Sequence, residues 1–103
     1  MTNKPIIRLR AKADIRAARK WYEKQLVGLG KSFVNAVEQA IAKAAADPMR
    51  FPEVRTGYRR VLVDGFPYKV IFGVKPNSIV VVAIYHVKRD PSSWQARIDE
   101  EEI

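Results

Sequence analysis

Residues 58–91, YRRVLVDGFPYKVIFGVKPNSIVVVAIYHVKRDP, decide the fold, because they predict three consecutive β-strands joined by two tight turns. Most apolar residues in these strands are β-branched or aromatic, as is typical of β-structure. The strands cover residues 59–63, 68–74 and 79–85. Asp64-Gly65 predicts a two-residue hairpin turn of type I′, because this turn needs a positive φ that glycine tolerates. Pro76-Asn77 predicts the second turn, because proline fixes φ. The last strand is apolar on both faces, so we expect a strand inside the sheet that is covered on both sides.

Upstream of this stretch, the sequence predicts one short strand over residues 5–10. Its apolar residues, Ile7 and Leu9, alternate with the basic residues Arg8 and Arg10. Alternation of this kind is typical of a half-buried strand. We therefore expect an added strand of the sheet with a basic outer face.

Two helices are predicted between this strand and residue 58. Asp14 is expected to be the N-cap of the first helix, over residues 15–27, and the second helix extends from the break at 28–30 to about residue 46. The apolar residues of the second helix recur at helical spacing, which predicts one buried stripe. They are Phe33, Val37, Ala40, Ile41 and Ala44. The short break between the helices predicts an antiparallel helical hairpin.

The segments that follow the second helix and the last strand contain turn and capping residues. Proline at position 48 ends the second helix, so we expect residues 49–56 to form a connecting loop. Asp90 and Pro91 predict the N-cap and first residue of a short C-terminal helix. This helix is expected to continue through Trp94 and Ile98 into an acidic tail at 99–103.

These elements together predict an α+β fold. We expect an N-terminal strand, an antiparallel helical hairpin packed on an antiparallel β-sheet, and a short C-terminal helix. The length of 103 residues predicts a single domain over residues 1–103 that includes the acidic tail.

The composition narrows the classes of partner and compartment. The chain has no cysteine, which excludes disulfides and thiolate metal sites, and it has no apolar run of membrane-spanning length. No phosphate loop or metal-ligand spacing is present, so we expect no metal and no cofactor. The default compartment is the cytoplasm, without a membrane partner. The net charge of +8 favours a polyanionic partner, the alternative being that the basic residues form only a solubilising surface.

An ordered set of short motifs resembles the RelE/ParE superfamily of bacterial toxins, most closely its ParE branch. The motifs are Arg59-Arg60, Phe66-Pro67-Tyr68, His86 and Arg89-Asp90-Pro91, in the predicted order of strand, two helices and three strands. The resemblance covers residues 7–97. It implies the toxin of a type II toxin–antitoxin system, neutralised by a cognate ParD-like antitoxin in a hetero-oligomer. It also implies two possible targets, DNA gyrase for ParE-like members and ribosome-bound messenger RNA for RelE-like members.

For the ParE-like function we expect a toxin that acts by binding gyrase. Its antitoxin should be acidic and should fold on the toxin, because the toxin combines a basic body with an apolar helical hairpin. We predict two groups of binding residues. The group for the target contains Arg60, Tyr68, Lys88, Arg89 and Trp94, and the group for the antitoxin contains Trp21, Phe33, Arg8 and Arg10.

The first alternative is a ribosome-dependent, metal-free endoribonuclease. Metal-free RNA cleavage needs a base, an acid and cations around the phosphate. His86, the only histidine, is the candidate acid or base, and Arg59, Arg60 and Arg89 are the candidate phosphate ligands. A histidine at the end of an apolar strand is also typical of a packing and hydrogen-bonding residue. The second alternative is a family member that retains only binding and causes no growth arrest.

Overall fold

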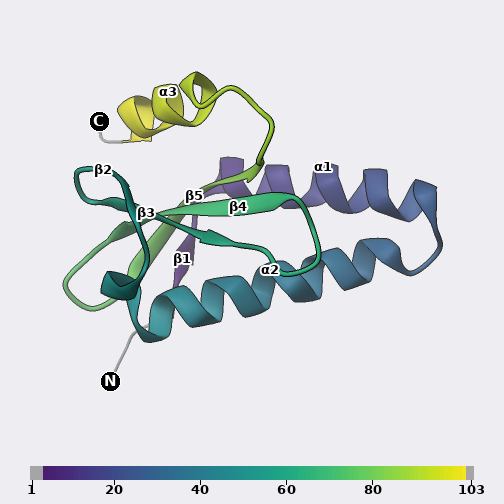
Figure 1. The fold of residues 1–103 in the computed structure, drawn as a ribbon, viewed down its shortest axis with the longest axis horizontal. Coiled ribbons are helices and arrows are strands. Elements are labelled where there is room, and N and C mark those ends of the chain that lie inside the picture. The colour runs from purple at the N-terminus through teal and green to yellow at the C-terminus, as the bar shows by residue number, and fades with distance from the viewer. Residues whose placement is uncertain (1–3, 102–103) are drawn as a thin grey trace.

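The computed structural model describes residues 4–101 and contains three α-helices and five β-strands (Figure 1). In chain order the elements are β1 Ile6–Ile7, α1 Leu9–Gln25, α2 Leu29–Ala46, the 3₁₀ turn η1 Pro48–Arg50, β2 Glu53–Arg55, β3 Tyr58–Leu62, β4 Tyr68–Val74, β5 Ile79–His86 and α3 Ser92–Glu101. This arrangement confirms the predicted α+β fold, with its helical hairpin and C-terminal helix. Within the described residues, none of the helices is both long and apolar enough to span a membrane.

The strands form one sheet in the order β1-β5-β4-β3-β2. Strands β2 to β5 are antiparallel neighbours, and β1 joins the sheet parallel to β5. The prediction that the last strand of the sequence lies inside the sheet is therefore confirmed. At the turn between β3 and β4, Gly65 has a φ of 83° and Asp64 has no positive φ. A type I′ turn needs a positive φ at both central residues, so this turn is of another type.

The sheet lies between two helical layers of unequal size (Figure 1). The hairpin of α1 and α2 covers one face, and the predicted apolar stripe of α2 is buried against it, which confirms that part of the prediction. The smaller helix α3 covers the opposite face through Trp94 and Ile98. We call this second face the outer face of the sheet.

The N-terminal prediction is wrong in its boundary between strand and helix. Strand β1 ends at Ile7, and α1 begins at Leu9 with Arg8 at its N-cap. Arg10 therefore lies in the first turn of a helix rather than on a basic strand, and Asp14 is inside the helix rather than at its start. The physical reason is that pairing with β5 stops after two residues, and alanine, lysine and arginine from position 10 onward favour a helix.

The predicted loop at 49–56 is also partly wrong, because it contains η1 and the edge strand β2. Glu53 of β2 pairs with Arg59 of β3, and the register shifts between Glu53 and Arg55. A strand of three residues at a sheet edge has too short an alternating pattern to be recognised from sequence.

The turn between α1 and α2 depends on Glu23, which accepts hydrogen bonds from the N–H groups of Gly28 at 2.9 Å and Gly30 at 3.0 Å. These two bonds lower the pKa of Glu23 below its ordinary value, because they favour the carboxylate. Gly28 has a φ of 90°, which suits glycine. Glu23 therefore supplies the N-terminal hydrogen bonds that the N-cap residue of α2 has no side chain to make.

Replacing Gly30 by alanine is expected to lower the free energy of unfolding by about 1–3 kcal/mol, because the close approach of α1 and α2 leaves no room for a methyl group. A Cβ at Gly30 would lie 2.7 Å from the carbonyl oxygen of Arg19. Urea titration of the two proteins measures the difference. Where space is available, this exchange stabilises a helix by about 0.5–1 kcal/mol, so a gain in stability would contradict the packing described.

Candidate functional site

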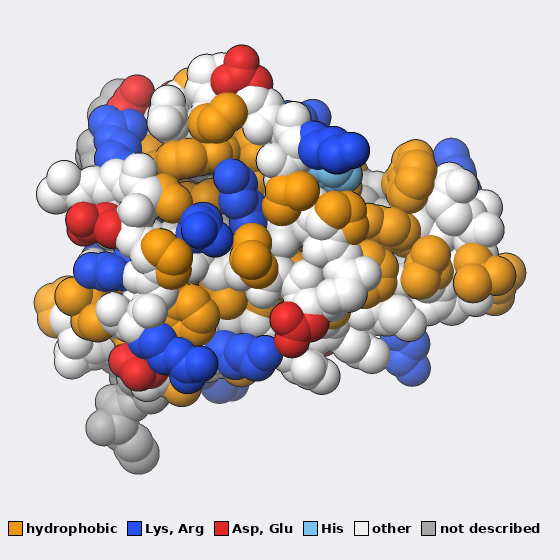
Figure 2. Space-filling model, viewed as in Figure 1, with side chains coloured by type: hydrophobic (Ala, Val, Ile, Leu, Met, Phe, Trp, Pro, Cys, Tyr) orange, Lys and Arg blue, Asp and Glu red, His pale blue; other side chains and the backbone are white. Residues whose placement is uncertain are grey.

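A groove of about 510 Å³ lies between α1 and the ends of β4 and β5, and we call it the α1–β5 groove. Its walls include Trp21 and Tyr22 of α1, Tyr68 of β4, His86 at the end of β5 and Arg89 just beyond it. Figure 2 shows the histidine at the surface beside a basic side chain, and apolar side chains gathered at the end of the helical hairpin. The groove therefore combines exposed aromatic rings with positive charge.

Strand pairing fixes the position of His86, because Tyr68 and His86 are direct partners across β4 and β5. Their ring centroids are 5.3 Å apart in an edge-to-face arrangement. The backbone N–H of Lys88 donates to His86 Nδ1 at 3.1 Å, so Nε2 carries the proton of the neutral ring. This arrangement holds the imidazole at the groove with one nitrogen already engaged.

The floor of the groove belongs to an aromatic cluster that joins the hairpin to the sheet. Tyr22 contacts Phe33, Phe66 and Tyr68, with centroid distances between 5.0 and 6.1 Å. Burial raises the pKa of Tyr22 and of Tyr68, and for Tyr68 the nearby Arg89 partly opposes this effect. Both phenols are therefore neutral at physiological pH, where they can donate hydrogen bonds but do not act as bases.

The predicted antitoxin-binding residues differ in their accessibility. Trp21 exposes 57% of its surface on α1, beside the exposed residues Leu26 and Val27 at the end of the hairpin. Phe33 is fully buried in the aromatic cluster, and its contact with the antitoxin stays a prediction. Arg8 and Arg10 lie at the start of α1, where Arg10 forms an ion pair with Glu100 of α3.

The predicted target-binding residues separate onto two faces of the sheet. Tyr68 and Arg89 line the α1–β5 groove, and Lys88 is exposed beside them. Arg60 pairs with Ile71, whose side chain belongs to the outer face. Trp94 belongs to α3 and is buried against the outer face of the sheet, with 4% of its surface exposed, and its contact with the target stays a prediction.

The residues predicted for RNA cleavage do not come together. His86 and Arg89 share the groove. Arg59 pairs with Phe72, four residues along β4 from Tyr68 and hence about 13 Å away, and its guanidinium donates to the carbonyl oxygen of Phe51 at 2.6 Å. Arg60 lies on the other face, so only one of the three predicted phosphate ligands is near the histidine.

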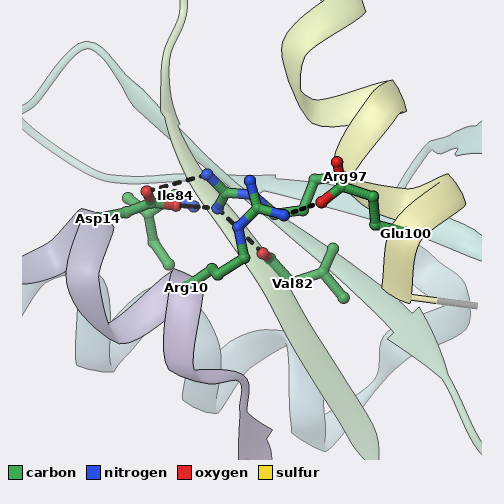
Figure 3. Close-up of polar contacts among 6 residues, drawn as sticks. All are labelled: Arg10, Asp14, Val82, Ile84, Arg97 and Glu100. Carbon is green, nitrogen blue, oxygen red and sulfur yellow. Dashed lines mark hydrogen bonds and ion pairs between the residues drawn. The ribbon is translucent and has the colours of Figure 1, made fainter.

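Sequence reasoning missed the buried ion pair of Asp14 and Arg97, which joins α1 to α3 behind the groove (Figure 3). Arg97 Nη1 lies 2.5 Å from Asp14 Oδ2, and Nη2 lies 3.3 Å from Oδ1. Their side chains are only 13% and 17% exposed. The available signal was the position of Arg97, which falls between Trp94 and Ile98 on the buried side of the C-terminal helix.

The same pair completes the hydrogen bonding of β5 beyond the end of β1. Pairing with β1 ends at Val81. Asp14 Oδ2 accepts a hydrogen bond from the N–H of Ile84 at 3.0 Å, and Arg97 donates to the carbonyl oxygen of Val82 at 3.2 Å (Figure 3). Two side chains therefore replace the strand that would otherwise satisfy these buried backbone groups.

Nothing in residues 4–101 suggests a metal centre, since no three histidine or acidic side chains there lie close enough together to bind one ion. The α1–β5 groove accordingly offers hydrogen bonds, aromatic surface and positive charge as its means of recognition.

Comparison with known proteins identifies a matching family and a solved structure with a similar fold. Residues 6–91 match the model of the family described as the ParE toxin of the type II toxin-antitoxin system parDE. A chain of the chromosomal ParDE TA system from P. aeruginosa has a similar structure, with a TM-score of 0.71 and 17% identity over 81% of this chain and 94% of that chain. No curated protein matches the sequence. Helix α3 lies beyond the residues that the family model matches.

Proposed function

Because the chain belongs to the ParE toxin family of type II toxin–antitoxin systems, we propose that it inhibits bacterial growth by binding DNA gyrase and that a cognate antitoxin neutralises it. The antitoxin expected here has an acidic and apolar segment that folds on the toxin to form a hetero-oligomer. Both partners act in the cytoplasm.

The observation that carries this proposal is the composition of the α1–β5 groove. Trp21 is exposed at its rim, with Tyr68 and Arg89 nearby, and tryptophan, tyrosine and arginine are the residues enriched at the centres of protein interfaces. Two of the three arginines that RNA cleavage would need, Arg59 and Arg60, lie elsewhere on the sheet. The site therefore favours recognition of a protein over phosphate chemistry.

Induction of this chain alone in bacteria tests the proposal. We expect growth arrest with gyrase-linked DNA breaks and intact messenger RNA, and recovery of growth when the antitoxin from the neighbouring gene is co-expressed. Codon-positioned cleavage of messenger RNA without DNA breaks would instead support the endoribonuclease alternative. Expression without any arrest would support the alternative of a non-toxic binding module.

Trp21, a predicted antitoxin-binding residue, shares the α1–β5 groove with the predicted target-binding residues Tyr68 and Arg89. Replacing it by alanine is therefore expected to weaken target binding by about 30-fold or more, as for a central interface tryptophan, and to relieve growth arrest. The fold should persist because the side chain is mostly exposed. Titration of purified gyrase with the variant measures the loss. Lys75→Ala, at an exposed turn away from the groove, is the matched control and should bind as the parent does.

Replacing His86 by glutamine distinguishes binding from catalysis at the same groove. Glutamine retains a hydrogen-bond acceptor for the N–H of Lys88 but has no pKa near neutrality. Under the proposed function this variant arrests growth nearly as well as the parent. Complete loss of arrest in a folded variant that still binds antitoxin would argue for proton transfer by His86.

A further inference from the structure

Helix α3 is an acidic amphipathic helix that lies on a basic region of the outer face. Trp94 and Ile98 point into the sheet and are almost completely buried. Two of its acidic residues pair with arginines at the periphery: Asp99 lies 2.6 Å from Arg55, and Glu100 pairs with Arg10 (Figure 3). The contacts of α3 therefore indicate that this face of the sheet binds a helix with one apolar side and acidic residues beside it.

The surface under α3 has an apolar floor and a basic border. The floor contains Ile71, Val82 and Tyr85. Lys69 extends from the same face, and its ammonium lies 5.7 Å from the centre of the Trp94 ring. Figure 2 shows basic and apolar side chains interspersed over β3 and β4 below α3. An apolar floor that receives an indole ring, with cations around it, fits an acidic amphipathic helix.

The basic region continues along the sheet past the end of α3. A polar hollow of about 310 Å³ lies there, and its walls include Arg8, Lys75 and Gly73. Val82 borders both this hollow and the floor beneath α3. The floor beneath α3 and the polar hollow therefore adjoin each other on the outer face.

The contact between α3 and the sheet leaves several buried polar groups without a hydrogen-bond partner. In the part of the chain that the structure describes, three buried side-chain atoms lack a hydrogen-bond partner: Tyr85 Oη, Trp94 Nε1 and Arg97 Nε. All three lie between α3 and β5, and none lies under the helical hairpin. Each such group disfavours the docked state, and the exposed ion pairs at the border are weakened by salt. The buried ion pair of Arg97 and Asp14 is the main polar interaction that holds α3 on the outer face.

We propose that the outer face is a second protein-docking surface, that its ligand is an acidic amphipathic helix of a partner protein, and that α3 occupies it as an exchangeable cover. The partner helix would carry an aromatic residue, an arginine three positions later, an aliphatic residue one position further and then acidic residues, as α3 does. This inference does not depend on the identity of the toxin's target, and α3 lies outside the residues that define the family match.

The test uses a fluorescent peptide of residues 90–103 and the full-length chain. Ile98→Asp removes the fully buried aliphatic anchor of α3 and leaves the sheet unchanged. We expect this variant to bind the peptide at least 10-fold more tightly than the parent, because its own helix no longer competes. Equal binding by the two proteins, or binding by neither, would overturn the proposal.

A charge exchange tests the register of the bound helix. In the Ile98→Asp background, Arg55→Asp should weaken binding of the natural peptide about 10-fold, and a peptide with Asp99→Arg should recover it. An equal loss of affinity for both peptides would contradict a binding position in which residue 99 of the peptide lies next to residue 55. Binding of a 12-nucleotide single strand at 150 mM salt that equals or exceeds peptide binding would also overturn the proposal, because the surface would then be a nucleic-acid site.

Hydrogen exchange of the parent protein provides a second test that needs no variant. Amides of α3 should exchange at least 10-fold faster than those of β5, and the difference should grow as potassium chloride is raised. If the amides of α3 and β5 exchange at the same rate at all salt concentrations, α3 opens only on global unfolding and is not an exchangeable cover.

Discussion

Replacing Phe33 by alanine is expected to lower the free energy of unfolding by about 3–5 kcal/mol, because it leaves a cavity where three aromatic rings meet. Phe33 is fully buried, and its ring centroid lies 5.2 Å from that of Tyr22, 5.2 Å from that of Phe66 and 5.1 Å from that of Tyr68. Urea titration followed by circular dichroism measures the change.

The control for this prediction is Met49→Ala, which truncates an exposed apolar side chain and should change stability by less than about 0.5 kcal/mol. Phe33→Leu should cost less than Phe33→Ala, because most of the volume is kept. A loss below 1 kcal/mol for Phe33→Ala would show that the aromatic cluster does not hold the hairpin on the sheet. Because Tyr68 is part of the cluster, the variant should also lose target binding.

Replacing Asp14 by alanine is expected to lower the free energy of unfolding by about 3 kcal/mol. The change leaves the guanidinium of Arg97 and the N–H of Ile84 without their acceptor. The loss is limited because α3 can leave the sheet and return Arg97 to water. We therefore expect the fluorescence of Trp94 to report solvent exposure at lower urea concentration than the circular dichroism signal of the sheet.

The matched control is Asp64→Ala, which removes the exposed ion pair with Lys43 and should cost about 0–1 kcal/mol. Asp14→Asn should lose less than Asp14→Ala, because its carbonyl oxygen still accepts from Ile84. If Asp14→Ala and Asp64→Ala lose the same amount, the buried pair does not stabilise the junction of α1, β5 and α3.

The sequence predicted well those elements whose pattern is local. Residues 68–74 form a run rich in β-branched and aromatic side chains between two turn signals, and β4 has those bounds. The stripe of α2 repeats at helical spacing over three turns and is buried as expected. Strand β2 and the end of β1 depend instead on which neighbour completes their hydrogen bonds, and that information is not contained in the short segments themselves.

The site was predicted less completely, because the register between strands and contacts between residues distant in sequence determine which side chains lie together. The motifs that contain Tyr68 and His86 were recognised separately, but only the pairing of β4 with β5 makes them neighbours. Asp14 has the chemistry of an N-cap and also of an ion-pair partner, and its actual partner is 83 residues away. Arg59 and Arg60 are both candidate phosphate ligands, but the alternation of a strand allows at most one of them to face any given site, and the sequence does not say which.

The parallel pairing of β1 with β5 also has a consequence during synthesis. It joins Ile6 to Val80. At about 5–20 residues per second, roughly 4–15 s pass on the ribosome between these two residues. The helical hairpin is made early in that interval, when the strand that supports it does not yet exist. A nascent chain interrupted before β5 would therefore have no α1–β5 groove.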